Sequence, residues 1–267
     1  MKSKKLSIFI FGFFLVFLVF SFLLEGKLSD MNPELAFLTP SWIHWFGTDS
    51  LGRDLFAKSL VGFRNSLLIA SLALLISFIL GLFFGFTSAT GGSFQKRIVS
   101  RFILFFQALP DFFIITFVLF YLNKYFNGSE YSKHFHFILV VGFFSWIGIS
   151  QFVRLQVLNE NEKSYIEGAR AIGLSHFGIL NKHLWPQISK DVLVYTFSKI
   201  PYFLLYESTF SFLGFGIQSP NYTLGVLFQE GWRSIAIYPH LVFFPMLYVF
   251  VVSYLVNYYV LNVKSKK

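Results

Sequence analysis

Three charged residues in strongly apolar segments are the first candidates for chemistry in this sequence: Asp111, Lys199 and Glu207. A charge inside a bilayer is costly and normally faces the interior of a helix bundle or a water-filled path. Asp111 could instead accept hydrogen bonds from backbone donors that Pro110 frees, and Lys199 could extend to the membrane surface. Glu207 either faces a permeation pathway or anchors the end of a helix, for example by pairing with Arg233.

Other reactive side chains form no catalytic set. The chain has no cysteine, and its six histidines lack the spacing of metal ligands. No paired carboxylates or Ser/His array converge within the apolar segments, so an intramembrane enzyme is the weakest hypothesis. The sequence also lacks the Gly-x-x-x-x-Gly-Lys-Ser/Thr loop that holds nucleotide phosphates. We therefore expect no enzyme activity, no cofactor and no metal site in this chain.

The composition indicates that lipid is the solvent for much of the chain. Of the 267 residues, 55% are hydrophobic and 13% are charged, and a soluble domain of this size could not bury so much apolar surface. The net charge of +9 is spread among the apolar runs and forms no continuous basic patch for nucleic acid.

Five uncharged or nearly uncharged runs are long enough to cross a bilayer, and a sixth is weaker because it contains Lys199 and Pro201. The first run follows three lysines, as a signal peptide does, but the residues after it do not resemble a cleavage site, so we expect it to be retained. Runs of this length predict helices rather than barrel strands, and hence an all-α bundle of six transmembrane helices. The runs are residues 6–24, 66–90, 102–122, 135–153, 192–206 and 241–263.

The distribution of Lys and Arg predicts the orientation of the bundle, because cytoplasmic loops accumulate these residues. With six spans and the N-terminus inside, fourteen of them fall in cytoplasmic segments and seven in outer segments, and Lys199 stays in the membrane. Five spans would place the two Lys-rich ends on opposite faces. We therefore expect both termini to be cytoplasmic.

The outer loop, residues 25 to about 65, is too long and too patterned to be a simple connection. It contains Gly47-Thr48-Asp49 followed by Gly52-Arg53-Asp54. Glycines on either side of Asp and Thr predict a turn followed by a helix whose first N–H groups are capped by a side-chain oxygen.

The inner loop, residues 154–190, contains Glu-Gly-Ala-Arg-Ala-Ile-Gly at 167–173 and His-Leu-Trp-Pro at 183–186. This pattern predicts a helix from Asn161, a break at Gly173, and a second short helix that ends near Pro186. Such an amphipathic hairpin either docks on a partner protein or lies on the membrane surface.

The inner loop resembles the cytoplasmic EAA loop of binding-protein-dependent ABC permeases, in the form found in the dipeptide/oligopeptide/nickel subfamily. Gly168 stands where alanine is usual, and Trp185 stands where leucine is usual. The positions that carry the resemblance are Glu167, Ala169, Gly173 and Pro186.

Further segments match the same subfamily in the expected order. Ala108-Leu109-Pro110 fits the third span. The Gly-Thr-Asp and Gly-Arg-Asp triplets of the outer loop resemble the signature before the second span of the C-type permease subunit. The segment after the fifth span is matched by Glu207, Ser211, Phe212, Leu213, Gly214, Pro220 and Gly225.

The resemblance implies an ABC importer permease of the type I fold. Residues 1–65 would be the first helix and an extracytoplasmic segment, 66–263 the permease core with five helices and the coupling loop 154–190, and 264–267 a basic cytoplasmic tail. The residues expected to form the contact with the ATPase are Glu167, Gly168, Ala169, Gly173, Leu174, His183 and Pro186, and Gly173 would be the bend.

The resemblance also implies partners. These are a homologous permease subunit that forms a heterodimer, two cytoplasmic ATPase subunits that bind ATP and Mg²⁺, and an extracytoplasmic substrate-binding protein, all at a bacterial plasma (inner) membrane. The expected cargo is di- or oligopeptides, with nickel or another small solute as the alternative. A self-contained secondary transporter is the weaker alternative, because the sequence shows no inverted repeat.

Overall fold

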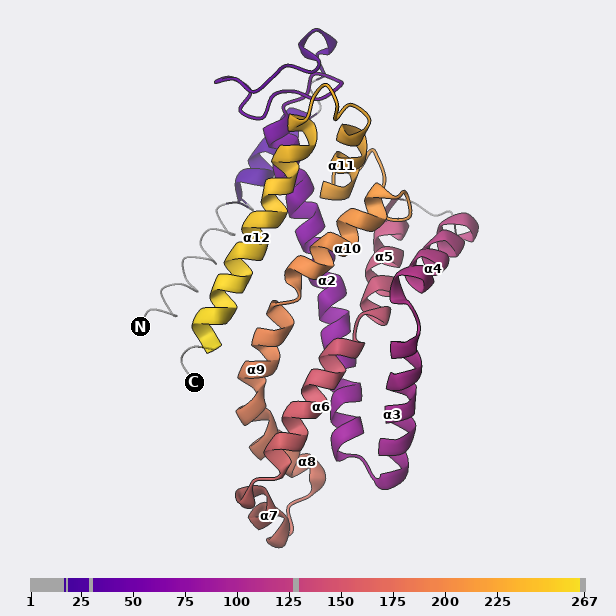
Figure 1. The fold of residues 1–267 in the computed structure, drawn as a ribbon, viewed down its shortest axis with the longest axis vertical. Helices are drawn as coiled ribbons and strands as arrows, with labels where there is room; N and C mark the ends of the chain where they lie inside the picture. Colours follow the sequence, from indigo (N-terminus) through magenta and orange to yellow (C-terminus); the bar gives the residue numbers. More distant parts are fainter. Residues whose placement is uncertain (1–16, 18, 29–30, 127–129, 265–267) are drawn as a thin grey trace. The chain divides into compact units, whose positions relative to one another are not determined.

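The computed structural model describes residues 17, 19–28, 31–126 and 130–264, and these are predominantly helical (Figure 1). The β-structure of the described part is an isolated antiparallel bridge between Thr48 and Asp54. Most of the predicted first span, residues 6–24, lies outside the described residues, as does most of the tail 264–267. Residues 17 and 19–25 are helical and lead into the short 3₁₀ turn η1 (Gly26–Leu28).

Three segments among the described residues are long and apolar enough to cross a membrane. They are α2 (Leu55–Thr90), residues 132–161 of α5 (Glu130–Phe144) and α6 (Ile147–Asn161), and α12 (His240–Lys264). A fourth candidate is the bent pair α3 (Ser93–Ala108) and α4 (Asp111–Tyr125). These segments include four of the six predicted runs, and the full count of six stays a prediction.

The second predicted span is longer than the sequence suggested. We assigned residues 55–65 to the outer loop, but they form the first turns of α2, which has 36 residues. At a rise of about 1.5 Å per residue this helix is roughly 54 Å long, well beyond the hydrocarbon thickness of a bilayer. The apolar run alone does not mark its start, because charged residues such as Lys58 are buried in these turns.

The third predicted span, residues 102–122, is not one straight helix. Helices α3 and α4 meet at 82°. The cause lies at Pro110, which has no N–H to donate and disfavours helical backbone at the preceding residue. Leu109 accordingly has φ −85° and ψ 133°.

The weak run 192–206 is likewise divided, into α9 (Trp185–Phe197) and α10 (Ile200–Phe212). Pro201 is the second residue of α10, where its missing N–H costs least. The chain therefore leaves the helix at Ser198 and Lys199, the position that the sequence marked as the interruption.

The chain divides into two compact units. Unit 1 draws on Met1–Ser71, Leu119–Phe137 and Ile200–Lys267, and unit 2 on Leu72–Val118 and Ile138–Lys199. In unit 1, α10, α11 (Leu224–Trp232) and α12 pack on one another. With nine residues, α11 is too short to cross a bilayer.

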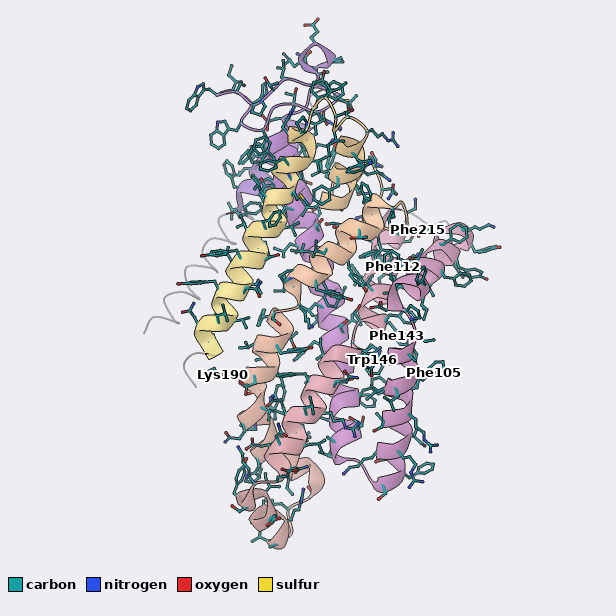
Figure 2. The ribbon with its side chains drawn as sticks, in the orientation of Figure 1. Phe105, Phe112, Phe143, Trp146, Lys190 and Phe215 are labelled. Carbon is teal, nitrogen blue, oxygen red and sulfur yellow. The ribbon has the colours of Figure 1, made fainter. Side chains whose placement is uncertain are left out.

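In unit 2, α2 approaches α6 closely at two glycines one turn apart. A Cβ on Gly81 would lie 2.6 Å from Ile149, and one on Gly85 would lie 2.6 Å from Val153. Small residues four apart let helix backbones meet in this way in membranes. Nearby, Trp146, which is labelled in Figure 2, is 1% exposed. Its ring stacks on that of Phe84, with the ring centres 4.3 Å apart.

Candidate functional site

The signature segment 47–54 of unit 1 forms a tight turn and then a capped helix, as predicted. Gly47 and Gly52 have φ of 79° and 73°, in the left-handed region that favours glycine. A Cβ on Gly52 would lie 1.8 Å from the carbonyl oxygen of Asn32. Asp54 caps α2, because its Oδ1 accepts the N–H of Ala57 at 2.9 Å.

The same segment fastens the outer loop to itself. The hydroxyl of Thr48 donates to the carbonyl of Leu35, at the end of η2 (Pro33–Leu35), and accepts the N–H of Leu38 at 2.8 Å. The second carboxylate oxygen of Asp54 lies 2.9 Å from Nδ1 of His44. The signature residues thus hold residues 35–48 against the start of α2.

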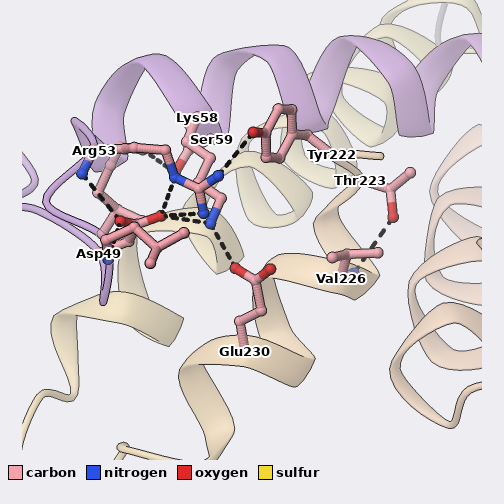
Figure 3. A network of polar contacts seen from close by, with 10 residues as sticks. Asp49, Arg53, Lys58, Ser59, Tyr222, Thr223, Val226 and Glu230 are labelled. Carbon is pink, nitrogen blue, oxygen red and sulfur yellow. Dashed lines mark hydrogen bonds and ion pairs between the residues drawn. The ribbon is translucent and has the colours of Figure 1, made fainter. Parts of the chain in front are cut away.

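Asp49 is the centre of a buried charge cluster, which consists of Asp49, Arg53, Lys58, Tyr222 and Glu230 (Figure 3). Its Oδ2 accepts hydrogen bonds from Nε of Arg53 at 2.8 Å and from Nζ of Lys58 at 2.7 Å. Its Oδ1 accepts the backbone N–H groups of Leu51 and Arg53. Lys58 also contacts Glu230, and Arg53 donates to the hydroxyl of Tyr222 at 2.9 Å.

The cluster is electrically balanced, with two cations and two carboxylates. Lys58 is 1% exposed and Asp49 is 4% exposed, whereas the side chain of Glu230 is 37% exposed. Burial alone would raise the pKa of Asp49, but the charge and hydrogen bonds of Lys58 and Arg53 outweigh it and hold that pKa below its ordinary value. Asp49 is therefore the charged group on which both buried cations depend.

Glu207 lies in a second polar centre of unit 1 and is completely buried. Its carboxylate accepts the hydroxyls of Ser66 at 2.5 Å and Ser211 at 2.9 Å, and Ser66 in turn accepts the N–H of Leu224 at 2.9 Å. These contacts join α2, α10 and the start of α11. Serines hold the carboxylate, while Arg233, the candidate partner named from the sequence, is exposed.

The segment after α10 turns sharply at Gly214, which has φ 89°. Ser211 accepts the N–H of Ile217 at 3.0 Å, and the carbonyl of Phe212 accepts the side chain of Gln229 at 3.1 Å. Leu213 is 46% exposed. Of the four predicted residues, Ser211 and Phe212 therefore fix the turn, and Leu213 faces outward.

The two other predicted intramembrane charges lie at helix breaks. Asp111 is the first residue of α4, directly after Pro110. Its carboxylate accepts the N–H of Phe112 at 2.8 Å. Lys199 lies between α9 and α10, with its ammonium 4.8 Å from the ring centre of Tyr195. Asp111 thus contacts a backbone donor, as one of its two interpretations expected, and the choice between the interpretations of Lys199 stays a prediction.

The inner loop of unit 2 contains a short amphipathic helix, α7 (Ser164–Ala171), which buries Ile166 and Ala169. The helix ends in a Schellman motif: Leu174 donates its N–H to the carbonyl of Ala169, and Gly173 donates to that of Arg170. Gly173 has φ 83°, so the break falls where the sequence predicted it.

One side of α7 is exposed in the structure. Glu167, Gly168 and Ala171 are exposed, and Ile172 is 79% exposed although it is a large apolar residue. A Cβ on Gly168 would meet no atom within 4 Å. The helix therefore presents a small, partly apolar surface with an acidic residue beside it.

Side-chain contacts fix α7 to the end of α6. The carboxylate of Glu160 contacts the ammonium of Lys163 at 2.8 Å and the hydroxyl of Tyr165. Burial and this carboxylate raise the pKa of Tyr165 to about 12, so its hydroxyl stays a donor at neutral pH. Arg170 donates to the side chain of Asn161 at 2.9 Å.

The second helix of the inner loop does not end near Pro186, contrary to our prediction. After α8 (His176–Ile179) the chain forms a π-helical segment, η3 (Leu180–Leu184), and continues into α9. Trp185 donates its N–H to Leu180, five residues back. This wider turn accommodates the proline that would break a regular α-helix, and it leaves His183 partly buried and Pro186 exposed.

Comparison with known proteins places these features in a family. The sequence matches the binding-protein-dependent transport system inner membrane components over residues 77–266. The chain belongs to this family. The all-α membrane fold and the resemblance to binding-protein-dependent permeases inferred from the sequence are thereby confirmed.

Relatives of this permease match most of its length. The oligopeptide transport system permease protein OppC of Haemophilus influenzae is 29% identical over 263 residues, which are 96% of this chain and 81% of the relative. The OppC protein of Escherichia coli is 32% identical over 216 residues, which are 80% of this chain and 68% of the relative. The dipeptide transport system permease protein DppC of Bacillus subtilis is 29% identical and covers 96% and 80%.

Solved structures show the same fold at much lower identity. A chain of the MetNI methionine ABC transporter in an inward-facing conformation has a TM-score of 0.58 at 16% identity, covering 76% of this permease and 92% of that chain. A chain of an amino acid ABC transporter gives 0.57 at 15% identity, covering 79% and 95%.

Sequence reasoning missed three members of the charge cluster: Lys58, Tyr222 and Glu230. A signal was present, because Lys58 follows Asp49 and Arg53 closely and precedes a long apolar run. A charge at such a position needs a partner. The identity of Glu230, 172 residues further along the chain, is set by the fold and not by local spacing.

Proposed function

We propose that this permease is one transmembrane subunit of an ATP-driven importer of di- or oligopeptides. The names of its relatives, which are permeases of oligopeptide and dipeptide transport systems, support the substrate class. Its partners would be a homologous permease, two cytoplasmic ATPases and an extracytoplasmic binding protein. ATP and Mg²⁺ would bind the ATPases, and this chain would form half of the translocation path.

The observation that carries the proposal is the geometry of α7. A helix that serves as a docking element needs an uncovered face and a firm attachment to the elements it moves. The exposed side around Gly168 and Ile172 meets the first requirement, and the contacts of Glu160 and Arg170 with neighbouring residues meet the second. An apolar helix face seated in a groove of a partner is a common mode of recognition.

In this proposal the face of α7 seats in a cytoplasmic ATPase, and both chain termini lie on the same side of the membrane. When the ATPases close around ATP, they move α7, and the attached helices shift between two packings. The Schellman motif at Gly173 fixes the angle between α7 and the following helix. Glu167, which is exposed on α7, would contribute a negative charge to this contact.

Two glycines provide a matched test, because both have open space around them. Gly168 lies inside α7, where alanine removes backbone freedom from the unfolded chain and stabilises the helix by about 0.5–1 kcal/mol. Gly173 has left-handed backbone, where alanine costs about 1–2 kcal/mol. The same substitution therefore strengthens α7 at one position and distorts its end at the other.

The experiment purifies each tagged variant in mild detergent, identifies the chains that co-purify, and measures ATPase activity. We expect Gly168→Ala to retain the ATPase subunits and Gly173→Ala to lose them or to uncouple hydrolysis from substrate. If neither wild type nor Gly168→Ala brings down ATPase subunits, and the purified chain alone transports peptide into liposomes without ATP, the proposal is wrong.

A further inference from the structure

A short segment of the outer loop exposes large apolar side chains. Trp42 is 97% exposed, Ile43 84% and Trp45 61%. No Asp, Glu, Lys or Arg occurs between residues 35 and 48. Leaving such side chains in water is unfavourable, at about 25 cal/mol for each Å² of apolar surface. We therefore expect an apolar phase or an apolar partner surface to cover this segment.

Aromatic contacts show where this segment lies along the helices of unit 1. Phe46 stacks on Phe244 of α12, with ring centres 4.2 Å apart. Trp45 packs on Phe56, the second residue of α2, at 5.2 Å. Both α2 and α12 are candidate membrane spans, and both begin beside this segment (Figure 1). Trp42 to Trp45 therefore lie level with the ends of two spans.

The apolar surface continues onto the first helix. A groove of about 570 Å³ is lined by Phe20 and Leu24 together with Ile43, Trp45 and Phe56. Phe20 is 44% exposed, and its neighbours Phe22 and Leu23 are also exposed, as expected for a helix that faces lipid. At the same groove Asp54 and His44 contact each other at 2.9 Å.

We infer that Trp42, Ile43 and Trp45 insert into the interfacial layer of the bilayer and contact lipid, and that the groove below them receives part of an acyl chain. Tryptophan favours this layer because its ring is apolar while its N–H can bond to headgroups or water. The exposed apolar side chains of Phe20, Phe22 and Leu23 continue this surface, which favours lipid over a protein partner. The anchor would hold the signature segment 47–54, and with it the charge cluster, at a fixed depth.

The test uses a favourable property of the chain, which contains no cysteine. Single cysteines replace Trp42, Glu34 or Phe250, and each carries a nitroxide label in the protein reconstituted in phosphatidylcholine vesicles with its co-purifying chains. Glu34 is an exposed residue of the same loop and reports water, whereas Phe250 is 63% exposed within α12 and reports lipid. Accessibility of the label to oxygen and to a water-soluble nickel chelate gives its depth.

We expect the oxygen-to-nickel ratio at position 42 to lie above that at position 34 and below that at position 250. A ratio at 42 equal to that at 34 overturns the inference. If the oxygen-to-nickel ratio at position 42 changes only after a soluble binding protein is added, the inference is also overturned. The segment is then assigned to protein docking instead. In unlabelled protein, Trp42→Ser should lower the fraction of tryptophan emission quenched by brominated lipid, and an unchanged fraction contradicts lipid contact.

Discussion

Replacing Asp49 by asparagine should destabilise unit 1 more than any other single change in the charge cluster. The substitution keeps the shape of the side chain but removes its charge, and the side-chain amide then presents hydrogens toward Lys58 and Arg53. Two buried cations would be left with Glu230 as their remaining carboxylate. Breaking a buried pair by neutralising one partner costs about 3–5 kcal/mol, and we expect a loss of that size.

The control is Glu230→Gln, because the side chain of Glu230 is 37% exposed. Its cationic partner, Lys58, retains its hydrogen bond to Asp49 in this variant. Partly exposed ion pairs contribute about 0–1 kcal/mol. Both variants are compared with wild type by thermal unfolding in detergent, followed by tryptophan emission. If Asp49→Asn unfolds at the wild-type temperature, or if Glu230→Gln lowers that temperature equally, the assignment of Asp49 as the centre of the cluster is wrong.

The pH dependence of the same pair gives a further check. The pKa of Asp49 is lower in the folded protein than its ordinary value of 3.8, so its contribution to stability is complete above that value and is lost as the pH falls through the folded pKa. The difference in stability between wild type and Asp49→Asn should therefore be constant above pH 3.8 and narrow below it. A difference that shrinks already near neutral pH would contradict a lowered pKa.

Two other substitutions test packing by the same unfolding assay. Ser66→Ala should cost about 1–3 kcal/mol, because it leaves the buried N–H of Leu224 without its acceptor, and Ser66→Thr, which keeps the hydroxyl, should cost less. Gly85→Ala should destabilise unit 2 by about 1–3 kcal/mol, because the new Cβ would lie 2.6 Å from Val153. Gly168→Ala, with open space, is the control, and equal unfolding temperatures for the two glycine variants would refute the close helix approach.

The sequence predicted features that depend on local backbone chemistry. The break at Gly173 followed from glycine at the end of an amphipathic pattern. A capped helix after the turn followed from the glycines, Asp and Thr of the segment 47–54, and the structure identifies Asp54 as the capping residue. Both need only a few neighbouring residues, because a left-handed C-terminal residue and a side-chain acceptor for early N–H groups are local requirements.

Features that depend on distant pairing could not be predicted in the same way. Lys58 looked like an outer-loop cation, but in the structure it lies in a helix and is neutralised by Asp49 and Glu230. Arg233 was one candidate partner for Glu207, but the fold brings Ser66, 141 residues away in the sequence, to its carboxylate. The hydropathy of residues 102–122 also indicated one span and did not reveal the 82° bend at Pro110.

The wrong prediction at Pro186 matters for how the inner loop could act on the membrane helices. A helix that ended there would place a flexible joint between α7 and the span that follows, and movement of α7 would be absorbed by that joint. The π-helical turns of η3 instead carry the helix past the proline, so residues 176–197 form one continuous element roughly 30 Å long. Since Gly173 fixes the angle at one end and the break at Ser198 and Lys199 limits the other, this element is suited to transmit a displacement of α7 as a rigid body.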